Sequence, residues 1–182
     1  GFARLDRWVE MARRCGVEYY EIAHLFTQWG AKHAPKIVAS VNGHMQQIFG
    51  WDTSATGDCY VDFLRAYLPA LKAELARLGV LDRCYFHISD EPSLSMLEDY
   101  RAARDYACHD LQGLPVVDAL SSFEFYATGA VEHPIPAINH IQPFVDAKVP
   151  GLWTYYCIGQ YKDVSNMFMA MPSQRNRILG VM

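Results

Sequence analysis

The sequence predicts an α/β fold, an incomplete (β/α)8 TIM-type barrel of about five parallel strands with intervening helices, in a single domain over residues 1–182. Two observations favour this fold. Apolar strand-like segments alternate with amphipathic helical segments, and polar residues follow several strands at their carboxyl ends. A complete barrel needs about 250 residues, so the chain is about two or three strand–helix units short. We therefore expect units to be missing at both ends, around a core that 51% apolar residues can fill.

The first part of the chain is predicted to contain a helix, a strand and a long excursion before a second helix. Apolar residues at helical spacing predict helices over residues 3–15 and 58–78. Residues 17–24 have the composition of a strand. In the excursion, an Asn-Gly pair predicts a tight turn that joins residues 36–41 to residues 45–49 as a hairpin. Such an excursion is a usual place for substrate contacts.

The second part of the chain repeats the alternation of strand and helix. A capping box at Ser95 and Glu98 predicts the start of a helix that ends before Gly113. An aromatic-rich loop is expected around Phe123, a brief helix over residues 142–148, and a last helix from near Pro172. The strands predicted in this part are residues 82–89, 115–119, 136–140 and 151–157.

Two adjacent carboxylates, Asp90 and Glu91, end the apolar strand that begins at Cys84, and Pro92 prevents the strand from continuing. Ligands of parallel α/β folds bind at the carboxyl ends of the strands, where this pair lies. Like charges this close disfavour double ionisation, so one pKa should rise and supply an acid beside an ionised partner. The alternative is a pair of acidic residues that only stabilises the start of the following helix.

Composition and charge argue against several classes of protein. The net charge is −4 without a basic run, so nucleic acid is not an expected partner. The sequence holds no apolar stretch of 18 residues, so membrane insertion is not expected. The five cysteines lack paired spacing and are predicted to be buried thiols, without a disulfide scaffold, a metal site or a cofactor. Secreted, periplasmic and cytoplasmic locations all stay open, and the sequence does not indicate an oligomeric state.

Four ordered segments carry a resemblance to a known family and together span nearly the whole chain. They are residues Glu21–His33, His87–Pro92, Leu152–Tyr156 and Pro172–Arg177. On these segments the chain resembles the catalytic domain of glycoside hydrolase family 123. The resemblance implies a (β/α)8 barrel, a carbohydrate substrate and the activity of a β-N-acetylgalactosaminidase.

The resemblance also implies a retaining, substrate-assisted hydrolysis, in which the 2-acetamido oxygen of the sugar attacks the anomeric carbon. In this scheme Glu91 protonates the leaving oxygen and then activates water. Asp90 orients the acetamido group and stabilises the oxazolinium-like intermediate. Ordinary retaining enzymes need two carboxyl groups about 5–5.5 Å apart across the scissile bond, and substrate-assisted enzymes are the exception. Adjacent residues at one strand end suit the exception better.

Other residues near the strand ends are candidates for binding the sugar. Polar side chains after the first strand can bind hydroxyl groups, and aromatic rings can stack on a pyranose. The candidate substrate-binding residues are His24, Gln28, Trp29, Lys32, Asp118, Tyr126, Trp153 and Tyr155. The alternative for the aromatic residues is core packing, and for Asp118 it is capping of the following turn.

Two other functions stay open on the sequence alone. The first is a metal-dependent hydrolase that uses His24, His87, Asp90 and His140 as ligands, although HxH and HExxH spacings do not occur. The second is a carbohydrate-binding barrel that has lost turnover. The intact Asp90–Glu91 pair argues against this second function.

Overall fold

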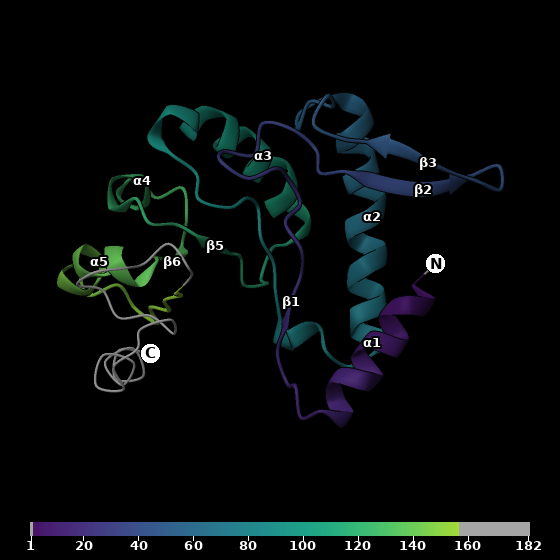
Figure 1. The fold of residues 1–182 in the computed structure, drawn as a ribbon, viewed down its shortest axis with the longest axis horizontal. Coiled ribbons are helices and arrows are strands. Elements are labelled where there is room, and N and C mark those ends of the chain that lie inside the picture. The colour runs from purple at the N-terminus through teal and green to yellow at the C-terminus, as the bar shows by residue number, and fades with distance from the viewer. Residues whose placement is uncertain (1, 157–182) are drawn as a thin grey trace, which may run out of the picture.

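The computed structural model describes residues 2–156 and shows a mixed α/β fold (Figure 1). The helices are α1 (Ala3–Arg14), α2 (Asp58–Arg77), α3 (Leu97–Asp110), α4 (Phe123–Ala127) and α5 (Gln142–Asp146). The strands are β1 (Tyr20–Glu21), β2 (Ile37–Val41), β3 (His44–Phe49), β4 (Cys84–Tyr85), β5 (Val117–Ala119) and β6 (His133–Ile135). Short 3₁₀ turns occupy Leu81–Arg83, Leu94–Met96 and Ile138–His140.

The strands other than β2 and β3 follow one another in parallel. β1 pairs with β4, and β5 pairs with β6, both in parallel register. A parallel bridge between Phe86 and Val116 joins these two sheets, and another bridge joins Ala137 to Tyr155. Parallel strands that follow one another along the chain therefore lie next to one another in space, as expected for successive strand–helix units. Over residues 2–156 the row does not close into a barrel.

Four of the predicted strands differ from the observed ones, and the second, predicted over residues 82–89, is ladder-paired only at Cys84–Tyr85. The first is ladder-paired only at Tyr20–Glu21, and the last contributes only the bridge at Tyr155. The fourth lies at His133–Ile135 instead of residues 136–140, where a 3₁₀ turn begins at Ile138. Prolines on both sides of Ile135 made this segment unlike a strand in the sequence. Pro134 is tolerated because alternate residues of a parallel strand direct their backbone groups to opposite edges, and its missing N–H faces away from β5.

Helix ends also differ from the predictions. Gly57, not Asp58, precedes the first turn of α2, and α3 begins at Leu97 without the predicted capping box. The aromatic-rich loop contains a short helix, α4, because the Ser122 hydroxyl accepts a hydrogen bond from the Phe125 N–H at 3.1 Å. The hairpin of β2 and β3 and the helix α1 are confirmed. The predicted helix near Pro172 lies outside the described residues.

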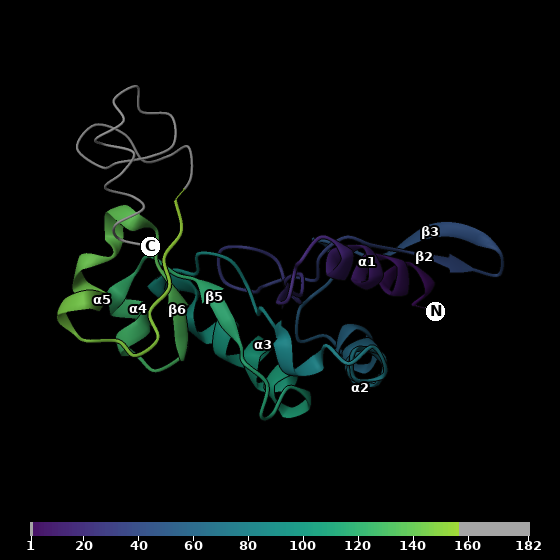
Figure 2. The same ribbon diagram turned by 90° about the horizontal axis from the view of Figure 1, so that it is seen from below.

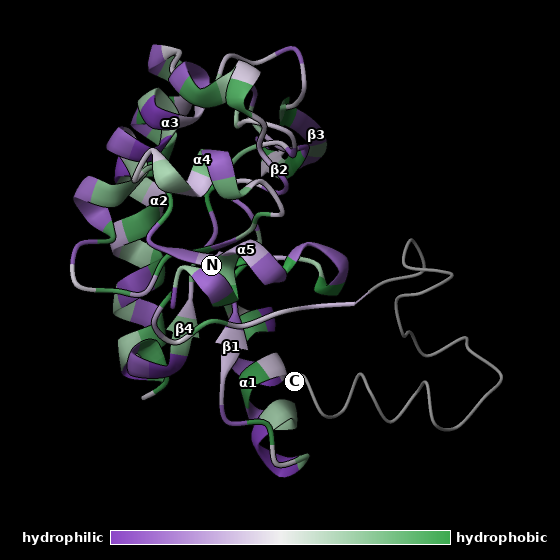
Figure 3. Ribbon diagram, turned by 90° about the vertical axis from the view of Figure 1, so that its left-hand side faces the viewer, coloured by the Kyte–Doolittle hydropathy of each residue, from purple (hydrophilic) through white to green (hydrophobic). Residues whose placement is uncertain are grey.

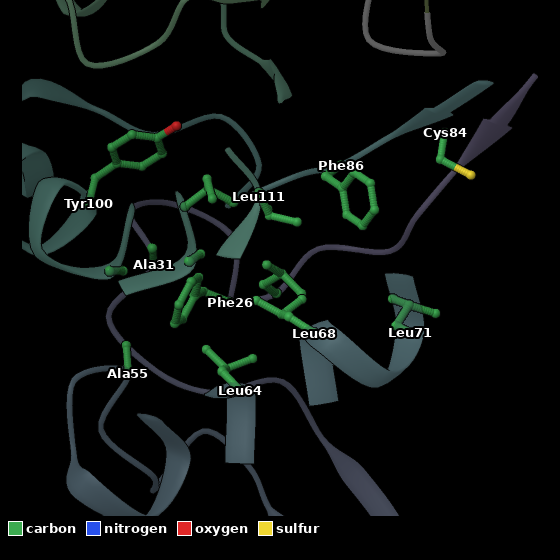
Figure 4. Close-up of a cluster of buried hydrophobic side chains, with 14 of the residues drawn as sticks. Phe26, Ala31, Ala55, Leu64, Leu68, Leu71, Cys84, Phe86, Tyr100 and Leu111 are labelled. Atoms are coloured by element: carbon green, nitrogen blue, oxygen red, sulfur yellow. The ribbon is translucent and has the colours of Figure 1, made fainter. Parts of the chain in front are cut away.

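The core lies between the row of strands and the helices α2 and α3, which lie on the same side of the strands in Figure 2. Both helices alternate hydrophobic and hydrophilic residues along their length (Figure 3), so each presents an apolar face to the strands. Figure 4 shows Phe26, Leu64, Leu68 and Phe86 packed together in this layer. This core fixes one face of β4 and leaves its other face to line a cavity.

The cysteine prediction is only partly right. Cys84 is buried, but Cys15, directly after α1, and Cys59, in the first turn of α2, are exposed. All four cysteines among residues 2–156 are free thiols, and Cys157 lies outside the described residues. Within the same residues, no helix combines the length and apolar character needed to cross a membrane.

Candidate active site

Glu91 lies at the carboxyl end of the β4 segment in an unusual backbone conformation. Its φ angle is 45°, in the left-handed region that residues other than glycine rarely occupy. The N–H of Glu91 donates to the Ala119 carbonyl at 2.9 Å, which ties this strained residue to β5. Backbone strain of this kind gathers at active sites, where the surrounding structure enforces it.

The carboxylate of Glu91 is held by hydrogen bonds from two residues. Ser121 donates from its backbone N–H to Oε2 at 3.0 Å and from its hydroxyl to Oε1 at 2.8 Å. The hydroxyl of Tyr155 donates to the same Oε1. The Ser121 hydroxyl is itself fixed, because it accepts the Ala137 N–H at 3.2 Å. The orientation of Glu91 is therefore set by the ends of three neighbouring strand segments.

A cavity of about 300 Å³ lies beside Tyr155 on the face of the strands opposite the helices. Its size is at the lower end of the range for small-molecule sites. Residues from each parallel segment line it, namely Glu21, Tyr85, His87, Val117, Ala119, Ile135, Trp153, Thr154 and Tyr155. Trp153 is half-exposed and packs on Tyr85 with ring centroids 4.9 Å apart. The cavity thus combines aromatic walls with a few polar groups.

The loop after β1 is fastened to the segment that carries the two carboxylates. The Trp29 N–H donates to the Asp90 carbonyl at 2.7 Å. The buried Ser89 hydroxyl donates to the Thr27 carbonyl at 2.7 Å and accepts the Gly30 N–H at 3.3 Å. A side chain at Gly30, whose φ is +129°, would also collide with Met96. The loop therefore stays close to Asp90, with the Trp29 indole half-exposed.

A second polar group on the cavity wall consists of Glu21 and His87. The Nε2 atom of His87 lies 2.9 Å from the Glu21 carboxylate, and its Nδ1 atom lies 3.6 Å from Asp118. The Glu21 side chain is exposed, whereas His87 is buried. The ring of His24 packs edge-on against His87 at 5.4 Å. This arrangement places an exposed carboxylate beside a buried imidazole on the cavity wall.

Asp118 is fully buried and lies outside the residues that line the cavity. Its Oδ1 accepts the N–H groups of Ile88 and Ser89 at 2.9 and 3.2 Å. Its Oδ2 accepts the hydroxyl of Tyr100. Burial raises the pKa of the Asp118 carboxyl, and the contacts with His87 and Tyr100 offset part of that effect. Burial and the nearby Asp118 likewise raise the pKa of Tyr100.

The predicted site residues lie in three different places, apart from the buried Asp118. Trp153 and Tyr155 line the cavity, and Glu91 accepts a hydrogen bond from Tyr155. The Asp90 backbone is bound to Trp29 on the loop after β1. The side chains of His24, Gln28 and Lys32 are exposed on the loop after β1. Tyr126 instead packs against Phe123 and Phe144 between α4 and α5.

Two polar residues that line the cavity, Glu21 and His87, and the Glu91 partner Ser121 were not among the predicted catalytic or substrate-binding residues. Glu21 and His87 lie within strand segments, where a polar side chain on the inner face was the only signal. Ser121 follows β5 directly, and a hydroxyl residue at the carboxyl end of a strand could have marked it. Among residues 2–156, no three His, Cys, Asp or Glu side chains are grouped closely enough to hold a metal ion, so the rival ligand set is not assembled there.

Comparison with known families decides the membership of the chain. The model of the glycoside hydrolase 123 catalytic domain matches residues 1–182. The chain belongs to this family. A solved family 123 glycoside hydrolase from Clostridium perfringens, studied for glycolipid glycan hydrolysis, has a similar fold with a TM-score of 0.63 and 13% identity. No curated protein matches this chain.

The family 123 chain described here is shorter than its structural relative. The similarity covers 91% of this chain but only 31% of the Clostridium perfringens chain. At 13% identity the similarity concerns the fold alone. Family membership makes the chain a glycoside hydrolase 123 catalytic domain.

Proposed function

We propose that the protein is a retaining glycoside hydrolase that removes β-linked N-acetylhexosamine, with N-acetylgalactosamine as the preferred sugar. The 2-acetamido oxygen of the substrate attacks the anomeric carbon and forms an oxazolinium-like intermediate, which water then opens. Glu91 donates a proton to the leaving oxygen and later accepts one from the attacking water. No cofactor or metal ion takes part.

The observation that carries this proposal is the fixation of the Glu91 carboxylate beside the cavity. Hydrogen bonds from Ser121 and Tyr155 hold a strained residue in one orientation. A general acid must lie within hydrogen-bond reach of the oxygen that it protonates, and such fixation supplies that geometry. The strain at Glu91 would have little reason to persist in a carboxylate that served only the protein surface.

Asp90 orients the acetamido group in this proposal. Its backbone is anchored by the Trp29 N–H on one side, and Glu91 is anchored to Ala119 on the other. The two carboxylates belong to adjacent residues of one strand end, so they cannot flank the scissile bond as an ordinary nucleophile and acid do. An attacking group from the substrate resolves this difficulty. Trp153 provides a stacking surface, and the exposed Glu21 carboxylate binds a hydroxyl group of the sugar.

The proposed architecture for this chemistry is a (β/α)8 barrel to which the described segments contribute consecutive strands. The parallel order of β1, β4, β5 and β6, with helices on one face and the cavity on the other, supports it. In such barrels the catalytic residues lie at the carboxyl ends of strands, as Glu91 and Ser121 do here.

The test compares Glu91→Gln with the wild type in the full-length protein on aryl 2-acetamido-2-deoxy-β-galactosides. Removing a general acid should lower kcat/KM by about 100-fold to 10,000-fold for poor leaving groups. The loss should be much smaller for dinitrophenyl, which leaves without a proton. Glu124→Gln is the control, because Glu124 is exposed on the nearby α4. A Glu91→Gln variant with the same loss for every leaving group, or with no loss, would contradict the assigned role.

A further inference from the structure

The strand that carries the two carboxylates contains an irregularity directly before them. The peptide groups His87–Ile88 and Ile88–Ser89 point the same way, although consecutive peptide groups of a regular strand alternate. The carbonyls of His87 and Ile88 accept the N–H groups of Leu25 and Phe26, at 3.1 and 3.0 Å. The next N–H groups, of Ile88 and Ser89, both point to the opposite side. This is the geometry of a bulge.

The bulge shifts the pairing of the carboxylate segment by one residue. Phe86 pairs regularly with β5, since its N–H donates to the Pro115 carbonyl and its own carbonyl accepts the Val117 N–H. With a period of two, the Asp90 N–H would next reach the Ala119 carbonyl. In the structure the Glu91 N–H occupies that position, at 2.9 Å. Glu91 therefore stands where a regular strand would place Asp90.

Asp118 satisfies the two N–H groups that the bulge leaves without backbone partners. In a regular ladder the Ile88 N–H would bind the Val117 carbonyl, but here the Asp118 carboxylate takes it together with the Ser89 N–H. Tyr100 from α3 holds the other carboxylate oxygen, at the edge of the core seen in Figure 4. A carboxylate is the strongest acceptor for two aligned amides, and a neutral apolar residue would leave both buried and unpaired.

We propose that Asp118, fixed by Tyr100, is a positioning residue that holds this bulge and thereby sets the register of Asp90 and Glu91. The inference rests on the proposed function of Glu91 and gives Asp118 a role other than contact with the sugar. When the carboxylate is removed, Ile88 can return to the Val117 carbonyl, which moves Glu91 out of reach of Ser121. Catalysis then suffers although the sugar-binding wall remains in place.

The first test uses kinetics of the full-length protein with Asp118→Ala and Asp118→Asn. The alanine variant should lose about 100-fold in kcat while KM stays within about threefold of the wild type, because misplacement of a catalytic group weakens turnover more than binding. The asparagine variant keeps an oxygen for the two N–H groups and should recover most of the activity. An alanine variant that folds and keeps kcat within about threefold of the wild type would overturn the inference.

The second test does not depend on activity. Hydrogen exchange at the amides of Ile88 and Ser89 should be much faster in Asp118→Ala and moderately faster in Tyr100→Phe than in the wild type. Tyr20→Phe is the matched control, because it removes the hydroxyl of another buried tyrosine, which donates to the Val17 carbonyl before β1. If Asp118→Ala does not fold, Tyr100→Phe is used for both measurements, the kinetics and the hydrogen exchange. If the exchange rates of both amides are unchanged, the inference about Asp118 is wrong. This outcome does not depend on whether Glu91→Gln supports or contradicts the proposed function.

Discussion

Ser121 donates two hydrogen bonds to the Glu91 carboxylate, one from its backbone and one from its hydroxyl, across 30 positions of sequence. The backbone bond depends only on the course of the chain after β5, whereas the hydroxyl bond can be removed by mutation. The same hydroxyl accepts the Ala137 N–H, so it connects Glu91 to the segment after β6. Mutation of Ser121 therefore separates the effect of its hydroxyl on Glu91 from the effect of its backbone N–H.

Ser121→Ala should lower kcat by about 5-fold to 50-fold, because Glu91 keeps the backbone bond but loses one hydrogen bond to a charged group. Steady-state kinetics on an aryl N-acetylhexosaminide measures the change. Ser122→Ala is the control, since Ser122 caps α4 and should cost about 1 kcal/mol of stability without an effect on kcat. Equal activity losses in both variants would show that Ser121 acts only on stability.

Tyr155→Phe should also lower kcat, by about 10-fold, since its hydroxyl donates to the same Glu91 oxygen as the hydroxyl of Ser121. The two donors position one group, so their effects should not add. The Tyr155→Phe, Ser121→Ala double variant should lose less than the product of the single losses. Strictly multiplicative losses would mean that the two hydroxyls act independently of each other and do not jointly position Glu91.

Trp153→Ala should raise KM more than it lowers kcat, because the half-exposed indole lines the cavity and offers a stacking surface there. Loss of about 1 kcal/mol of ring stacking corresponds to a roughly fivefold higher KM. Trp51→Ala is the control, because Trp51 is similarly exposed but does not line the cavity. A fall in kcat at unchanged KM would assign Trp153 to another role.

The stability of the protein should fall as the pH rises above about 9. Burial raises the pKa of the Cys84 thiol to about 11, and it also raises the pKa values of Tyr60 and Tyr100. For an acid whose pKa is raised by folding, the stabilisation is complete below the unfolded pKa and is lost as the pH rises towards the folded value. Denaturant unfolding at several pH values should show this slope, and Tyr60→Phe should reduce it.

Much of the fold follows from patterns in the sequence. Helical spacing of apolar residues places α1 and α2, and the Asn-Gly pair places the hairpin. The lengths of the strands were harder to predict from the sequence. Strand pairing ends where a side chain such as Asp118 accepts hydrogen bonds from the N–H groups of the neighbouring strand. No local pattern encodes such a substitution, since Asp118 and Ile88 are 30 positions apart.

The two carboxylates of the candidate site were predictable from the sequence, but the residues that hold them in place were not. Asp90 and Glu91 stand out as two carboxylates between an apolar strand and a proline. The strained conformation of Glu91, its bonds to Ser121 and Tyr155, and the burial of Asp118 arise from contacts between distant segments. Residue type and spacing predict which groups do chemistry, whereas tertiary contacts decide how those groups are held.

The most direct measurement of the central claim compares two substrates of the full-length protein, an aryl 2-acetamido-2-deoxy-β-galactoside and the matching β-galactoside with a 2-hydroxyl group. If the acetamido oxygen is the nucleophile, the first substrate is hydrolysed and cleavage of the second is undetectable. Efficient cleavage of the plain β-galactoside would contradict substrate-assisted catalysis.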